Sequence, residues 1–156
     1  MSEPICASAV SHVAICVRNM DESLRFYRNL LGFTVSKDEL QDTHTGGLPH
    51  LYHDRHAHRR SVHLRYGDRH SVPFLVLTEH PGEPVSGTPI MLDQVGISHI
   101  SFTIPNVEGL TQRLLAAGAH TCGPADAFRD ASGHIRTVFF RDPDGILVQF
   151  DEGGEG

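Results

Sequence analysis

The sequence predicts an α+β fold built from two tandem modules, each with a strand, a helix and three further strands. A repeat along the chain carries this prediction. The pair Ser11-His12 precedes a run of alternating apolar residues, and the pair Ser98-His99 precedes a second such run. Each run leads into an asparagine, an acidic residue and a helical pattern that ends at a glycine. Two copies of one βαβββ unit are therefore expected.

The first module is expected to begin with a strand over residues 13–17 and to continue with a helix over residues 21–31. Leucine and tyrosine recur there at helical spacing, and Gly32 supplies the residue that commonly ends a helix. Short apolar runs bounded by turn-forming residues predict three more strands, at residues 33–36, 61–66 and 72–78.

The second module repeats this order, with a strand over residues 100–104 and a helix over residues 107–117 that ends at Gly118. Its remaining strands are expected at residues 119–122, 134–141 and 146–150. The last two strands are separated by Asp142-Pro143-Asp144-Gly145, a sequence typical of a tight turn.

The length of 156 residues suits one domain, because a chain of this size can bury a core without disulfides or metals. We expect residues 1–156 to form a single domain, with module one over about residues 9–80 and module two over about residues 97–151. The stretch from about residue 79 to residue 96, where prolines and glycines gather, is expected to link the modules.

Composition and charge argue against a nucleic-acid-binding or membrane protein. The 13 lysines and arginines are outnumbered by 19 acidic residues, so the net charge of −6 opposes binding to phosphate backbones. No apolar run approaches the ~20 residues of a membrane span, and the N-terminal residues lack the pattern of a secretory signal. The three cysteines are widely spaced, which suits a reducing compartment. We therefore expect a cytoplasmic protein.

The first strand of each module has an aliphatic face and a polar face, because successive side chains point to opposite sides of a strand. The polar faces carry small or hydrophilic side chains: His12, Ala14 and Cys16 in module one, and His99, Ser101 and Thr103 in module two. The aliphatic faces are expected to pack on the helices, so that the polar faces wall a pocket. Alternation also places His63 on the polar side of its own strand.

Histidine is unusually frequent, with 12 residues, and many of these lie between His44 and His70. One interpretation is a solvated loop, since the same segment holds glycine, proline and charged residues. The other is a tract that binds metal. We favour the solvated loop, and we expect residues 38–60 to cover the pocket.

Four segments together resemble the vicinal oxygen chelate superfamily: SHVAICV, FYRNLLGF, ISHISFTI and RDPDGILVQF. That family includes glyoxalase I, methylmalonyl-CoA epimerase, fosfomycin resistance enzymes, extradiol dioxygenases and bleomycin-binding proteins. The resemblance spans nearly the whole chain, from about Val10 to Asp151. It implies that the two modules form a cupped, partly open barrel-like sheet with the helices outside. It also implies a divalent metal, held by the first and last strands of each module.

The resemblance implies a metal site made of His12, His99 and Gln149. The two histidines occupy the first-strand positions, and Gln149 stands where the family usually has a glutamate. The remaining position falls on Val76, which offers no ligand. Imidazoles suit Fe, Mn, Ni, Co or Zn. Three ligands leave positions open for a chelating substrate, as in the extradiol dioxygenases.

His63 is the candidate catalytic base, because an imidazole on the pocket face can accept a proton near neutral pH. His134 and Tyr52 are weaker candidates for the same role.

Two functions stay open at this point. The first is a metal-dependent enzyme, a dioxygenase, lyase or isomerase, whose small-molecule substrate chelates the metal through adjacent oxygens. The second is a metal-free protein that sequesters an antibiotic or a small hydrophobic metabolite, and so confers antibiotic resistance. Retention of both histidines favours the enzyme, and only 7% of the residues are aromatic, which disfavours a stacking pocket. We favour the enzyme, and the resemblance implies a homodimer.

Overall fold

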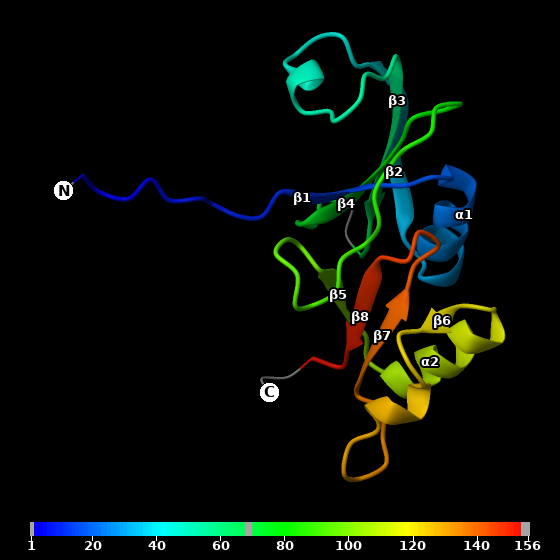
Figure 1. Ribbon diagram of the computed structural model, residues 1–156. Coiled ribbons are helices and arrows are strands. Elements are labelled where there is room, and N and C mark those ends of the chain that lie inside the picture. The colour runs from blue at the N-terminus through cyan, green and yellow to red at the C-terminus, as the bar shows by residue number, and fades with distance from the viewer. Residues whose placement is uncertain (1, 68–69, 154–156) are drawn as a thin grey trace. The chain divides into compact units, whose positions relative to one another are not determined.

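The computed structural model describes residues 2–67 and 70–153 and divides into two compact units, Met1–Ser86 and Gly87–Gly156 (Figure 1). Each unit contains a strand, a helix and three further strands in that order. The α+β class and the repeated βαβββ organisation are thus confirmed.

The first unit is a four-stranded sheet with the strand order β1-β4-β3-β2. Its elements in chain order are β1 (His12–Cys16), α1 (Met20–Leu24), β2 (Thr34–Asp42), β3 (His58–Arg65) and β4 (Phe74–Glu79). Strand β1 runs parallel to β4, whereas β3 is antiparallel to both of its neighbours. The first and last strands of the unit therefore lie side by side.

The second unit repeats this arrangement with the strand order β5-β8-β7-β6. Its elements are β5 (His99–Thr103), α2 (Val107–Ala116), β6 (His120–Thr121), β7 (Thr137–Arg141) and β8 (Leu147–Asp151). Strand β5 is parallel to β8, and β7 is antiparallel to its neighbours. Equivalent strands pair in the same sense in both units, as the sequence repeat predicts.

Both helices begin at the asparagine that the sequence indicates. The Asn19 side chain accepts the backbone N–H of Glu22 at 3.1 Å, and the Asn106 side chain accepts that of Gly109 at 2.9 Å. A carboxylate at or directly after the end of the last strand of each unit contacts the helix start as well. Glu79 accepts the N–H of Met20 in the first unit, and Glu152 accepts that of Val107 in the second.

One face of each sheet is buried, as the alternation predicts. In the first unit the buried face includes Ile15, Leu64, Leu75 and Leu77, which share the core with Met20, Leu24 and Tyr27 from the helical segment. In the second unit it includes Val138, Phe140, Val148 and Phe150, with Val107 and Leu114 from α2. The opposite face of β1 leaves His12, Ala14 and Cys16 exposed.

Three local features differ from the sequence-based expectation. Strand β2 extends to Asp42 and β3 begins at His58, so the irregular segment is residues 43–57 rather than 38–60. Strand β2 lies at the sheet edge and is mostly polar, so its sequence carries little alternation. The first helix continues as a π-helical segment over Arg25–Leu30. Strand β6 is only 2 residues long.

Among residues 2–67 and 70–153, no helix combines the length and the apolar character that crossing a membrane requires.

Candidate functional site

The polar face of the first unit gathers side chains around the ring of Phe74. His12 on β1 is the register partner of Phe74 on β4, and the two ring centroids are 5.3 Å apart. The Ser11 hydroxyl oxygen lies 3.1 Å from His12 Nδ1, within hydrogen-bond distance. When Nδ1 carries the proton and donates to this hydroxyl, Nε2 presents its lone pair to a ligand.

His63 contacts the same Phe74 ring from β3, at 5.1 Å between centroids. The guanidinium carbon of Arg65 lies 4.1 Å from the Phe74 centroid, in a cation–π contact. Burial lowers the pKa of His63, and the positive charge of Lys37 lowers this pKa further. His63 is therefore held in the neutral form that accepts a proton, on the face that also bears His12.

The polar face of the second unit brings His99 and Gln149 together around Phe139. His99 packs edge-to-face on Phe139 at 5.2 Å, and Gln149 is the register partner of Phe139. The Ser98 hydroxyl lies 2.8 Å from His99 Nδ1, which repeats the Ser11–His12 contact of the first unit. Gln149 donates from Nε2 to the Thr137 hydroxyl at 2.9 Å, so its carbonyl oxygen is the atom that a metal would contact.

Strand register makes Val76 the counterpart of Gln149. His12 pairs with Phe74 on β4, and His99 pairs with Leu147 on β8. Val76 lies two positions after Phe74, and Gln149 lies two positions after Leu147. The nearest carboxylate to Val76 along β4, that of Glu79, is held at the helix start by Met20. The predicted site residues thus form two pairs, His12 with His63 in one unit and His99 with Gln149 in the other.

The alternative bases lie away from these pairs within their own units. Tyr52 belongs to the loop between β2 and β3, where its ring contacts His56 and His80. His134 lies in the turn before β7, with its Nδ1 2.8 Å from the Ser132 hydroxyl.

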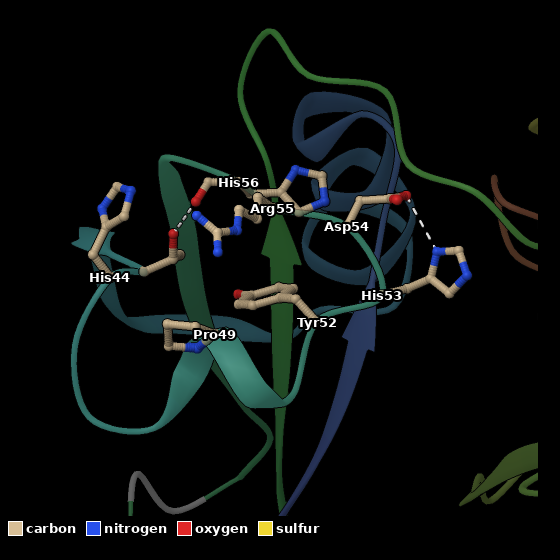
Figure 2. Close-up of a pocket in the computed structure, with 8 residues that line it drawn as sticks. His44, Pro49, Tyr52, His53, Asp54, Arg55 and His56 are labelled. Carbon is tan, nitrogen blue, oxygen red and sulfur yellow. Dashed lines mark hydrogen bonds and ion pairs between the residues drawn. The ribbon is translucent and has the colours of Figure 1, made fainter.

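The loop of residues 43–57 lines a hollow of about 410 Å³ in the first unit (Figure 2). The residues around it are Thr43, His44, Pro49, Tyr52, His53, Asp54, Arg55 and His56. A second hollow, of about 330 Å³, lies between this loop and the polar face, because Leu51 and Tyr52 line it together with Ala14, Cys16 and Thr78. The loop therefore covers part of the polar face of its own unit.

Sequence reasoning missed a cluster of His56, His80 and Glu83. One ligand atom from each residue lies within 4.8 Å of the others. The histidine-rich tract was expected to be a solvated loop, and this holds for His44 and His53, whose side chains are 69% and 88% exposed. The side chain of His56 is only 9% exposed instead, and His80 is buried. Only the high histidine count signalled this cluster, since two of its members lie beyond the tract.

Comparisons with known proteins agree with this architecture. A family model described as the glyoxalase/bleomycin resistance protein/dioxygenase superfamily matches residues 9–150. A search of curated proteins gave no match.

Solved structures with this fold cover nearly the whole chain. A glyoxalase family protein from Bacillus cereus aligns with a TM-score of 0.73 at 16% identity, over 96% of this chain and 97% of that one. The trypanothione-dependent glyoxalase I of Leishmania major aligns with a TM-score of 0.63 at 24% identity, over 94% and 88%. A fosfomycin resistance protein from Listeria monocytogenes aligns with a TM-score of 0.58 at 16% identity, over 96% and 94%. These likenesses establish the fold.

The family match extends over both βαβββ units, from before β1 to Phe150 in β8. On that ground, the chain belongs to the glyoxalase/bleomycin resistance protein/dioxygenase superfamily.

Proposed function

We propose that the protein is a metal-dependent enzyme whose small-molecule substrate binds a divalent ion through two adjacent oxygens. The ion would be held by His12, His99 and Gln149. One observation carries this proposal: in both units a serine hydroxyl lies within hydrogen-bond distance of Nδ1 of the first-strand histidine, so that Nε2 is the free ligand atom when Nδ1 carries the proton. The same contact thus recurs at both proposed histidine ligands.

The donor set fits a divalent transition metal. Two neutral imidazoles and one amide carbonyl suit Fe, Mn, Ni, Co or Zn, and none of these donors neutralises the positive charge of the ion. A bound ion of this kind supplies Lewis acidity to the oxygens of the substrate. Arg65, positioned over Phe74, adds positive charge on the same face as His12. Such a site favours a substrate with anionic oxygens.

His63 would act as the proton acceptor. Its lowered pKa keeps the imidazole neutral at pH 7, and its contact with Phe74 orients the ring on the face that carries His12. A neutral imidazole at this place supports a reaction that begins with removal of a proton from the bound substrate. An isomerase, a lyase or a dioxygenase acting on a diol requires such a step.

Assembly and location form part of the proposal. We propose that the two units act as one domain, that the chain forms a homodimer, and that it works in the cytoplasm. Among the described residues the three cysteines are not joined by disulfides, which suits a reducing compartment.

A metal-free binding protein is the second candidate. Phe74 and Phe139 place an aromatic ring beside the histidine on each polar face, and Val76 replaces a ligand with an apolar side chain. These features would suit an antibiotic or a hydrophobic metabolite.

Elemental analysis of untagged protein, purified without chelator, separates the two candidates. The enzyme proposal expects His12→Ala and His99→Ala each to lose one equivalent of metal relative to the wild type. If both variants keep the metal content and the thermal stability of the wild type, the proposed ligand set is wrong. The next step would then be a screen of antibiotics and metabolites for thermal stabilisation.

A further inference from the structure

We propose that His56, His80 and Glu83 form a second divalent-metal site, suited to Zn²⁺, that fastens the loop of residues 43–57 to the end of β4. This site shares no residue with the one proposed above and does not depend on it. His56 lies near the end of the loop, His80 directly follows β4, and Glu83 lies three residues further on. Their ligand atoms are within 4.8 Å of one another.

A ring nitrogen of His56 is withdrawn from water. The His56 side chain is only 9% exposed, and within the described part of the chain its Nδ1 atom has no hydrogen-bond partner. Glu83 Oε2 lies 3.4 Å from this nitrogen, which is ion-pair distance when His56 is protonated. When His56 is neutral, the nitrogen has no hydrogen-bond partner among the described residues, and a buried polar atom without one is costly. A cation between the two atoms would satisfy the lone pair and the carboxylate together.

The ring of His80 is oriented by a backbone contact. This residue is 5% exposed, and its Nδ1 atom lies 3.0 Å from the carbonyl oxygen of His58. Because a carbonyl only accepts, Nδ1 carries the proton and donates it, which leaves Nε2 as the ligand atom. Metal-binding histidines are commonly fixed by such a bond from their other nitrogen.

The three side chains together supply donors that suit zinc. Two imidazoles and one carboxylate form a set that binds Zn²⁺ with one position open. Donors that lie about 2.1 Å from a tetrahedral ion are about 3.4 Å apart, which matches the separation of His56 Nδ1 and Glu83 Oε2. Glu83 is also held toward the loop, since its carboxylate accepts the N–H of Ala57 at 3.3 Å.

Ligation requires a rotation of one ring. The His56 and His80 rings stack at 4.1 Å with an interplanar angle of 22°, so their lone pairs lie in nearly parallel planes rather than converging on one point. Tyr52 contacts both rings edge-on, at 5.6 Å and 5.0 Å. Figure 2 shows Tyr52 and His56 on the same loop beside the hollow. Binding would turn one imidazole against this support and draw the three ligand atoms together.

The loop of residues 43–57 forms one wall of a hollow on the polar face. Tyr52 and Leu51 line the hollow of about 330 Å³ whose other wall is Ala14, Cys16 and Thr78. An ion that joins His56 to His80 would fix the loop wall of that hollow against the sheet. Metal would then set how open the hollow is.

Titration of metal-free, full-length protein with Zn²⁺ against a chromophoric chelator tests the site. Loss of even an outer contact to a ligand lowers metal affinity by about 10- to 100-fold. His80→Gln and Glu83→Gln should therefore each lower the affinity for one of the bound Zn²⁺ ions at least about tenfold. Glu83 is partly exposed, so Glu83→Gln keeps the test valid if the buried histidine variant fails to fold. His44→Gln and His53→Gln are matched loop controls and should bind as the wild type does.

A second measurement follows the loop itself. Arg55 is exposed within the loop, so trypsin can cut after it, and Zn²⁺ should slow this cut in the wild type but not in Glu83→Gln. The double variant His12→Ala/His99→Ala should keep both the Zn²⁺ equivalent and the protection, which distinguishes this site from the one proposed above. Unchanged Zn²⁺ affinity in Glu83→Gln and His80→Gln would overturn the proposal, as would loss of the equivalent in the two control variants.

Discussion

Individual side chains on the polar faces are positioned by phenylalanine rings. In the first unit Phe74 contacts His12, His63 and Arg65, so that one apolar ring orients two imidazoles and a guanidinium. In the second unit Phe139 contacts His99 and lies beside Gln149. The rings also withdraw neighbouring groups from water, and burial is the main cause of the lowered pKa of His63.

His63 should make stability depend on pH. Its pKa in the folded protein lies below the value of about 6.5 expected when unfolded, so protonation favours unfolding. Above about pH 6.5 the imidazole is neutral in both states, and the protein keeps its full stability. As the pH falls from the pKa of His63 in the unfolded chain toward its lower pKa in the folded protein, the free energy of unfolding decreases. We expect His63→Gln to flatten the fall in the free energy of unfolding between about pH 7.5 and about pH 5.5, measured with urea. His53→Gln, at an exposed position, is the control, and a slope unchanged by His63→Gln would contradict the assignment.

Gln149 should decide how tightly the proposed metal binds. Replacing its neutral carbonyl by a carboxylate adds a negative charge to the donor set, so Gln149→Glu should tighten metal binding at least about tenfold. Isothermal titration with Mn²⁺ or Ni²⁺ would measure the change. Thr137→Val removes the hydroxyl that accepts the hydrogen bond from the Gln149 amide, so this variant is the control for loss of that bond. Equal affinity of Gln149→Glu and the wild type would mean that this side chain does not face the ion.

At the scale of elements, the two helices are fixed at their starts in the same way. An asparagine caps each helix, and a glutamate at or directly after the end of the last strand contacts its first N–H group. This arrangement links the helix to the end of β4 or β8. It also holds the Glu79 carboxylate at the helix start. Glu79 carries the carboxylate nearest to Val76 along β4, so the carboxylate that serves the helix does not serve the polar face.

Removing either cap should cost similar stability. We expect Asn19→Ala and Asn106→Ala each to lower the free energy of unfolding by about 1 kcal/mol, because each leaves a helix N–H group without its acceptor. Chemical denaturation would measure the change. Asn19→Ser and Asn106→Ser retain a capping oxygen, and if they lost as much stability as the alanine variants, capping would not be the cause.

At the scale of the molecule, two proposed metal sites share no ligand. A ligand that binds only the folded state at about 100 times its Kd stabilises that state by about 2.7 kcal/mol. We expect chelator to lower the free energy of unfolding of the metal-loaded wild type, and His99→Ala and Glu83→Gln each to remove part of this effect. Because the sites share no ligand, the losses should add in the double variant. Either single variant removing the whole effect would show that only one ion is bound.

The sequence predicted those features that recur locally along the chain. The helical patterns that follow Asn19 and Asn106 and end at Gly32 and Gly118, and the alternation of β1 and β5, depend on neighbouring residues, and the structure confirms them. The prediction of a strand at residues 33–36 found only the start of β2, because an edge strand need not alternate and the rest of β2 is mostly polar. The sequence did not predict the contact of His56 with His80. This contact joins a loop to a strand end, and the residues around each histidine do not indicate that it is withdrawn from water.

The parallel pairing of β1 with β4, and of β5 with β8, has a consequence for the order of folding. The ladder from β2 through β3 to β4 is antiparallel and joins strands that are successive in the chain, so it can form from local contacts. Strand β1 must instead reach β4 across the whole module, a closure that costs chain entropy before it is repaid by contacts. Docking of the first strand is therefore the late step in each unit. The histidine at the start of that strand, His12 or His99, reaches its place only when its module is otherwise complete.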